Sequence, residues 1–219
     1  MDGKRRVFVV ALGALLVTRG AVGHGESGPP KQQGSSLSRY RVDPKQSRLV
    51  VETETSGLAR MFSHDHQIEA GDFSGVVTFS EGNVKRASLE LTVRAGSLHL
   101  IEEKSVADRA AIENALREDV LETARYPEIS FKSHGVTSER RGDGTYDVRL
   151  TGELRLHGVR RTMTVPARIA LEPNGLHAIG ILEIRQSDFN ITPFSFVKGA
   201  VVIKDDVTIS FDIIANRLP

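Results

Sequence analysis

The sequence predicts a mainly β protein, an antiparallel barrel of about eight strands with one helical excursion between two of them. Apolar and polar residues alternate over several long segments, which is the pattern of strands with one buried face. Turn-forming sequences, such as PNG at 173–175, separate many of these segments. Closing the sheet into a barrel removes its edges, and a two-sheet sandwich is the alternative arrangement.

The first residues are predicted to be a targeting signal and not part of the fold. Residues 1–23 combine a basic start with a short apolar run, 7–17, and small residues at Ala21 and Gly23. This pattern is typical of a cleaved secretory signal peptide, and the apolar run is too short to span a bilayer. We therefore expect a periplasmic or secreted protein with no transmembrane segment after signal cleavage.

The remaining chain is expected to form a linker and a single domain. Residues 24–38 are rich in Gly, Pro, Ser and Gln, which indicates a flexible linker, and the domain then spans 39–219. A net charge of +1 gives no reason to expect nucleic acid as a partner. The chain has no cysteine, so disulfides, thiolate metal sites and a cysteine nucleophile are excluded.

Predicted strands follow one another through most of the domain. They lie at 48–54, 73–79, 87–98, 128–137, 145–159, 161–171, 176–186, 197–203 and 206–215. The clearest is 145–159, in which Gly152 marks the place where a long strand must bend. Its apolar face consists of Tyr146, Val148, Leu150, Leu154 and Leu156. Its polar face consists of Asp147, Arg149, Thr151, Glu153, Arg155 and His157.

One segment has helical spacing instead. Residues 105–123, SVADRAAIENALREDVLET, place Ala, Leu, Glu and Arg at intervals of three and four. Ser105 and Asp108 suit the start of a helix, and Pro127 ends the segment before the next strand. This is the predicted helical excursion.

Several segments, in order and spacing, resemble the YceI-like family, exported bacterial proteins with a lipocalin-like antiparallel barrel. The matching pieces are YRVDPKQSRLVVET, GDFSGVVTFSEG, ASLELTVRAGSL, YPEISFKS, LTGELRLHGVRRTMTVPA, IRQSDFNI and KDDVTISFDI. The resemblance implies binding of a long apolar molecule, typically a polyisoprenoid, in a tunnel through the barrel, without catalytic residues. REDVLETARYP and the His-Asp-His sequence at 64–66 depart from the family pattern.

The inward faces of the predicted strands supply a lining for such a ligand. An isoprenoid needs apolar area, and few polar groups, for its site. The candidate lining residues are Leu89, Leu91, Val148, Leu150, Leu154, Val165, Ile169, Ile209 and Phe211. The expected partner is an isoprenoid lipid or a quinone-like molecule. In the alternative interpretation, these side chains simply fill the barrel, and the protein is a stress or adaptor protein without a ligand.

His64 and His66 fall on one face of an extended segment and allow three roles. They could contact the polar head of a ligand at the barrel rim, bind a metal in an enzyme, or be structural. A metal site would need a third ligand, for which His99, His134 and His157 are the candidates. We expect the first or the last role, and therefore no enzyme, metal or cofactor. The oligomeric state stays open, with a homodimer as one option.

Overall fold

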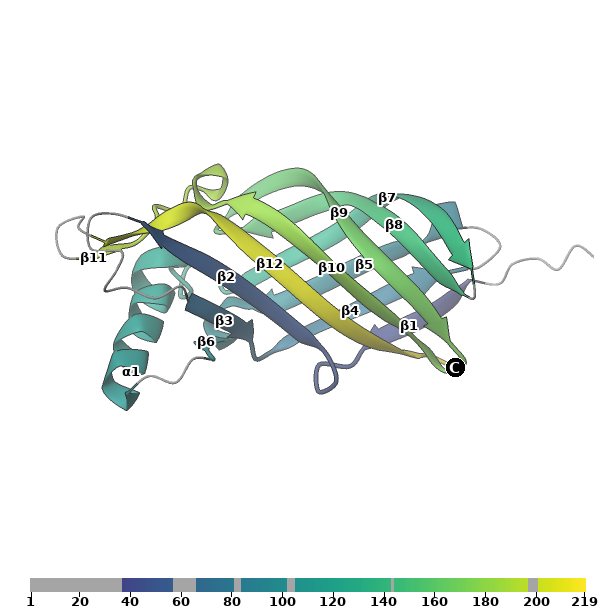
Figure 1. The fold of residues 1–219 in the computed structure, drawn as a ribbon, viewed down its shortest axis with the longest axis horizontal. Helices are drawn as coiled ribbons and strands as arrows, with labels where there is room; N and C mark the ends of the chain where they lie inside the picture. Colours follow the sequence, from purple (N-terminus) through teal and green to yellow (C-terminus); the bar gives the residue numbers. More distant parts are fainter. Residues whose placement is uncertain (1–36, 57–65, 81–83, 102–104, 143, 197–200) are drawn as a thin grey trace, which may run out of the picture. The chain divides into compact units, whose positions relative to one another are not determined.

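The computed structural model describes residues 37–56, 66–80, 84–101, 105–142, 144–196 and 201–219 (Figure 1). The chain divides into two compact units, residues 1–33 and 34–219, and all described residues belong to the second. In that described part, no helix is long and apolar enough to cross a membrane. The predicted signal peptide and most of the predicted linker lie outside the described residues.

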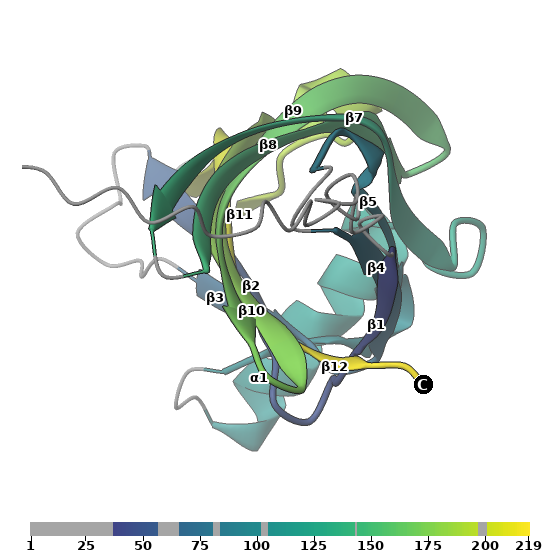
Figure 2. The ribbon, with the colours of Figure 1, turned by 90° about the vertical axis from the view of Figure 1, so that its right-hand side faces the viewer.

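Eight antiparallel strands form a closed barrel. Their order is β1-β4-β5-β7-β8-β9-β10-β12, and β12 pairs back with β1 to complete the circuit. The strands are β1 (Ser38–Val42), β2 (Arg48–Ser56), β3 (His66–Ala70), β4 (Phe73–Phe79), β5 (Ser88–Arg94), β6 (Leu98–Leu100), β7 (Glu128–Gly142), β8 (Thr145–Leu156), β9 (Val159–Glu172), β10 (Gly175–Arg185), β11 (Ser195–Phe196) and β12 (Val201–Arg217). Figure 2 shows the curved wall that they form. The predicted eight-stranded barrel is confirmed, and the sandwich is not the arrangement that the chain adopts.

Some barrel strands are built from two shorter segments laid end to end. β12 pairs with β1 near its end, at Val42↔Ala215, and with β2 along its middle, at Val51↔Ile209. In the same way β3 precedes β4, and β6 follows β5 across the 3₁₀ turn η3 (Ala95–Ser97). Bends of this kind let a long strand curve around a narrow interior.

Two strand predictions are corrected by these breaks. The predicted strand 87–98 is divided into β5 and β6, because η3 interrupts it. The predictions at 197–203 and 206–215 are one strand, β12, whose register shifts between Ile203 and Val207. The Asp-Asp pair at 205–206 resembles a turn in sequence, but the structure accommodates it as an irregularity within a continuous strand. Residues 197–200 lie outside the described part.

His157 is also placed differently from the prediction. The outward face of the strand was predicted to include it, but β8 ends at Leu156. His157 and Gly158 form the two-residue turn to β9, with φ values of 49° and 75°. Positive φ at both positions is what a tight type I′ hairpin turn requires, and the turn redirects the imidazole.

The helical excursion lies at one end of the barrel (Figure 1). α1 (Val106–Ala115) continues into the π-helical turn η4 (Leu116–Val120). Ser105 caps the helix as predicted, because its side chain accepts a hydrogen bond from the backbone N–H of Asp108. We call this end of the barrel the helical end, and the opposite end, where β12 finishes, the C-terminal end.

The C-terminal end is filled by aromatic packing. Tyr40, Phe79 and Tyr146 are all buried there, and we call these three side chains the aromatic plug. The rings of Phe79 and Tyr146 meet edge to face, with centroids 5.3 Å apart and an interplanar angle of 67°. Leu176 and Ala215, which pair across β10 and β12, are buried beside them. This end of the barrel is therefore closed by its own side chains.

Candidate functional site

An apolar cavity of about 160 Å³ lies inside the barrel. Side chains from β1, β2, β4, β5, β7, β8, β9, β10 and β12 line it, so the whole circumference of the barrel contributes. The alternation of each strand explains this convergence, because every second residue points inward. Phe79 of the aromatic plug also lines the cavity, and the plug thus bounds it toward the C-terminal end.

The apolar residues that the sequence proposed for the site come together around this cavity. Leu89 and Leu91 of β5, Val148, Leu150 and Leu154 of β8, Val165 and Ile169 of β9, and Ile209 and Phe211 of β12 all line it. Their role in binding a ligand remains a prediction. The structure adds lining residues that were not among the proposed site residues, among them Met163 and Leu182. Period-2 alternation in β9 and β10 was the signal that could have found them.

The lining of the cavity is almost entirely apolar. Among its described lining residues, Ser88 and Ser130 are the polar ones. The buried Ser133 nearby already has a partner in the barrel wall, since its hydroxyl accepts a hydrogen bond from Leu89 N at 2.8 Å. Charged groups lie outside, as in the pair Glu90–Lys132 at 2.6 Å, in which the lysine lowers the pKa of the glutamate. A buried polar head group would find few partners here.

The volume of the cavity is small compared with that of a long ligand. A volume of 160 Å³ is similar to that of an engineered cavity that holds benzene, and pockets for larger ligands measure about 300–1,000 Å³. Half-buried side chains such as Leu89, Leu91 and Met163 form part of the lining and have space to move. The thioether of Met163 is well suited to repacking. A chain longer than one isoprene-sized group therefore requires these side chains to shift.

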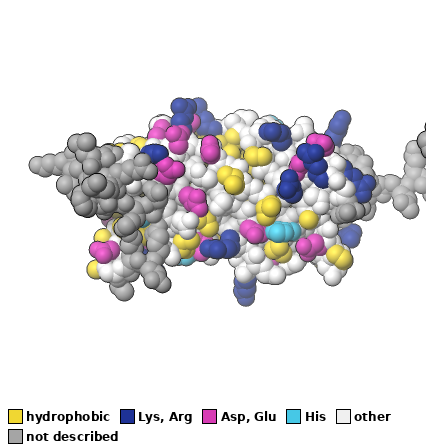
Figure 3. All heavy atoms as spheres, viewed as in Figure 1, with side chains coloured by type: hydrophobic (Ala, Val, Ile, Leu, Met, Phe, Trp, Pro, Cys, Tyr) yellow, Lys and Arg dark blue, Asp and Glu magenta, His cyan; other side chains and the backbone are white. Residues whose placement is uncertain are grey.

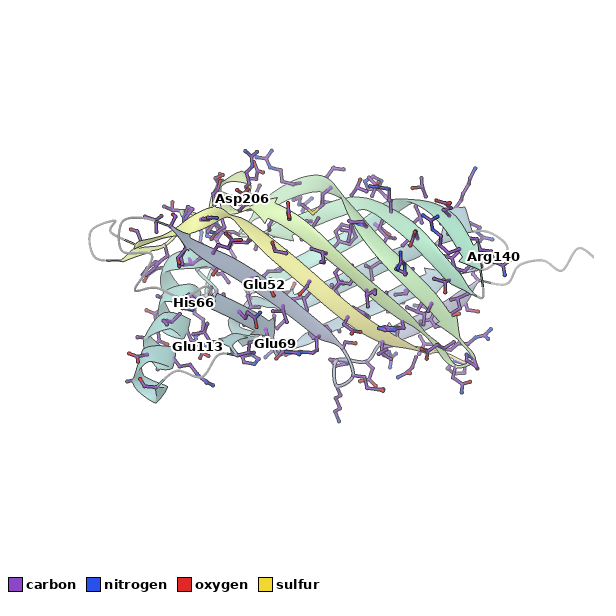
Figure 4. The ribbon with its side chains drawn as sticks, in the orientation of Figure 1. Glu52, His66, Glu69, Glu113, Arg140 and Asp206 are labelled. Carbon is purple, nitrogen blue, oxygen red and sulfur yellow. The ribbon has the colours of Figure 1, made fainter. Side chains whose placement is uncertain are left out.

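The two histidines singled out in the sequence are not part of this cavity's described lining. His64 lies outside the described residues. His66 is the first residue of β3, half-buried and near the helical end (Figure 4). Within the described part of the chain, no three or more His, Asp or Glu residues are grouped as a metal site would require. Of the possible third ligands, His99 contacts Ser97 O at 3.2 Å, and His134 is exposed.

His157 instead joins three segments at the helical end. Its side chain is 8% exposed, and its Nε2 and Nδ1 lie 3.2 Å from Glu122 Oε1 and from Phe189 O. Its ring also packs edge-on against Tyr126, with centroids 4.4 Å apart. The β8–β9 turn is thus connected to the end of the excursion and to the 3₁₀ turn η5 (Gln186–Phe189). Only the His-Gly turn sequence hinted at this position.

Comparison with known proteins agrees with this architecture. The sequence model of the YceI-like domain matches residues 40–215. A UPF0312 protein of Enterobacter sp. (strain 638) is 27% identical over 198 residues, which cover 86% of this chain and 88% of the relative. Protein YceI of Escherichia coli O17:K52:H18 is 31% identical over 129 residues, which cover 55% of this chain and 60% of the relative.

Solved structures share the barrel. BcnA of Burkholderia cenocepacia superposes with a TM-score of 0.63 at 21% identity, covering 80% of this chain and 99% of that one. A polyisoprenoid binding domain from Saccharophagus degradans superposes with a TM-score of 0.56 at 15% identity, covering 82% and 98%. At these identities the likeness establishes the fold.

Proposed function

The chain belongs to the YceI-like family, and on that premise we propose that it is a binding protein that holds the hydrocarbon chain of an isoprenoid lipid in its barrel. The observation that carries the proposal is the apolar cavity, whose lining comes from the full circumference of the barrel. The structural neighbour from Saccharophagus degradans is described as a polyisoprenoid binding domain, which supports the same class of ligand.

The chemistry of the lining favours the tail of the ligand over its head. Each methylene group moved from water into the cavity contributes about 0.8 kcal/mol. A quinone ring or an alcohol would lose hydrogen bonds to water and regain few from Ser88 and Ser130. We therefore propose that the polar head, whether quinone-like or not, remains at the surface while the tail is inside.

Two alternatives from the sequence are less well supported. A metal-dependent enzyme would have to use His64, which is outside the described residues, together with His66, which does not line the cavity. A completely filled barrel does not fit an interior cavity of about 160 Å³ beside half-buried leucines. The binding function accounts for both the cavity and its apolar lining.

We also propose that the protein is exported. The proposal rests on residues 1–23, whose basic start, apolar run and small residues are typical of a signal peptide. N-terminal sequencing of the protein from the periplasmic fraction is expected to give a start near His24. An intact Met1 in the membrane fraction would contradict export.

Native mass spectrometry of protein purified without detergent tests the binding function. The parent protein is expected to carry, or to take up, an isoprenoid alcohol such as geranylgeraniol. Leu91→Trp fills part of the cavity and is expected to abolish the bound species, with a loss of stability below about 1 kcal/mol. The chain has no other tryptophan, so the fluorescence of this residue reports directly whether the side chain is inside.

Leu100→Trp is the matched control. Leu100 is 1% exposed, lies at the helical end and does not belong to the cavity's lining. Overpacking there is expected to cost about 1–3 kcal/mol without blocking the ligand. A parent protein that binds no isoprenoid, or a Leu91→Trp variant that binds it normally, would refute the proposal. The same spectra distinguish a monomer from a homodimer.

A further inference from the structure

The β9–β10 hairpin is paired along only part of its length. Pairing starts beside the turn at Glu172↔Gly175 and stops at Arg168↔Ile179. Beyond that point β9 continues to pair with β8 as far as Val159, and β10 continues to pair with β12 as far as Arg185. Between residues 159–167 of β9 and 180–185 of β10, both fully described, no strand pairing joins the two. We call this stretch of the barrel wall the seam.

Pro166 explains why pairing stops at this place. Leu171 donates its N–H to Gly144 O, on the β8 side of β9, at 3.0 Å. Directions alternate along a strand, so even-numbered residues of β9 direct their N–H groups at β10. The next step of the ladder would pair Pro166 with Ile181, and proline has no N–H to donate. The two strands diverge from there toward the helical end (Figure 1).

The wall is also thin where the seam begins. Gly180 has no side chain, and Phe211, its neighbour on β12, covers it from inside. A Cβ atom at Gly180 would lie 2.3 Å from Phe211 Cζ and 2.4 Å from Pro166 O. Phe211 lines the interior cavity and also a groove of about 1140 Å³ on the outside of the barrel. Val148 and Ala167 line both as well, and the ring of Phe211 is the one that covers Gly180 on the cavity side.

The outer side of the seam is apolar. Ile179 and Ile181 are 42% and 58% exposed, and they are the exposed large hydrophobic side chains of the described residues. Both line the outer groove, and Figure 3 shows hydrophobic side chains in the middle of this face, between charged ones. At the far end of the seam, Arg161 Nε donates to Asp188 O of η5 at 3.0 Å. This hydrogen bond and the contact of His157 with Phe189 O connect the two sides there in place of a ladder.

We propose that the seam is the entrance through which an apolar chain passes between the outside of the barrel and the cavity. The aromatic plug closes the C-terminal end, whereas separating β9 from β10 breaks no ladder beyond Arg168↔Ile179. Ile179 and Ile181 present a hydrocarbon surface beside the opening, and Phe211 swings aside to admit the chain. This inference rests on the proposed function, because it assigns the route to the same cavity.

Cross-linking across the seam tests the route. Extending the register of the hairpin would set Thr164 opposite Glu183, and the chain has no cysteine of its own. Thr164→Cys with Glu183→Cys is joined by a bis-maleimide, and mass spectrometry selects the cross-linked protein. The control is Glu183→Cys with Thr208→Cys, which joins residues already paired between β10 and β12. Transfer of bound geranylgeraniol to phospholipid vesicles is then timed for each variant.

Equilibrium binding of geranylgeraniol is measured first, on the variants before cross-linking. The seam cross-link is expected to slow transfer by at least about tenfold, and the control cross-link to leave it unchanged. Pro166→Val, which restores the missing N–H, is expected to slow transfer while the affinity stays the same. Equal transfer rates with and without the seam cross-link would overturn the entrance and leave the binding function intact. Failure of the uncross-linked variants to bind would overturn both.

Discussion

The two ends of the barrel are closed by different kinds of contact. At the C-terminal end, the three side chains of the aromatic plug are buried, and Phe79 packs edge to face against Tyr146. At the helical end, the excursion is attached through His157, whose two ring nitrogens face Glu122 and Phe189. The first end is closed by aromatic packing, whereas the second combines apolar burial, as at Leu100 and Phe189, with directed polar contacts.

This difference indicates which end is rigid. Opening the C-terminal end would expose large aromatic surfaces to water, at a cost that rises with the area exposed. Opening the helical end would also expose Phe189 and Leu100, but part of its contact is between polar groups, which water can partly satisfy. β9 and β10 are also unpaired toward the helical end. We therefore expect motion of the barrel wall at that end, where fewer backbone hydrogen bonds hold the strands together.

The largest effect is expected from the plug. Phe79→Ala removes a ring that is 1% exposed and packs against Tyr146, and should cost about 3–5 kcal/mol of unfolding free energy. Urea unfolding followed by circular dichroism measures the change. A loss below about 1 kcal/mol would mean that the C-terminal end can collapse around the gap, and that it is not the rigid end.

A smaller effect is expected from the polar connection at the other end. His157→Gln should cost about 1–3 kcal/mol, because the contacts of the buried imidazole with the Phe189 carbonyl and the Glu122 carboxylate are removed. His177→Gln is the control, since His177 also faces a carboxylate, that of Asp212 at 2.7 Å, but is 35% exposed. Equal losses in the two variants would remove the special role of His157 at the helical end.

The smallest effect concerns acid stability on the outer surface. Asp147 accepts hydrogen bonds from Arg168 Nε at 3.0 Å and Arg141 Nε at 2.6 Å, and these bonds hold its pKa below the ordinary value. A carboxylate whose pKa is lower in the folded state stabilises the protein above its unfolded-state pKa. This contribution is lost as the pH falls through the folded-state pKa.

Asp147→Asn should therefore lower the urea midpoint at neutral pH and reduce the further fall between neutral pH and about pH 3. Glu183→Gln, an exposed carboxylate without an ion pair among the described residues, serves as the control. This explanation would be wrong if the urea midpoint of Asp147→Asn fell by as much on acidification as that of the parent protein.

Alternation predicted most of the fold and the inward lining. Tyr146, Val148 and Leu150 point inward because a regular strand leaves no other choice once one face is apolar. Interruptions of that regularity were not predictable in the same way. The break at η3 and the register shift in β12 depend on how distant strands pair, which a local pattern does not contain.

The candidate site was predictable in part for the same reason. The lining follows from strand periodicity, but the cavity's volume depends on how the side chains of all the strands fit together. His157 was misplaced because its local His-Gly turn was interpreted as part of a strand, and its contacts with Glu122 and Phe189 join segments far along the chain. Pro166 could be seen in the sequence, but only the register of the hairpin shows that it stands where the pairing of β9 with β10 stops.

Methyl nuclear magnetic resonance during titration with geranylgeraniol tests most directly whether the chain lies inside the barrel. The cavity account predicts shifted signals for the methyl groups of Leu91, Leu154 and Ile209, which line the cavity from three strands. The methyl groups of Leu100, packed at the helical end, should keep their positions. Bound ligand with unchanged signals from Leu91, Leu154 and Ile209 would contradict the account.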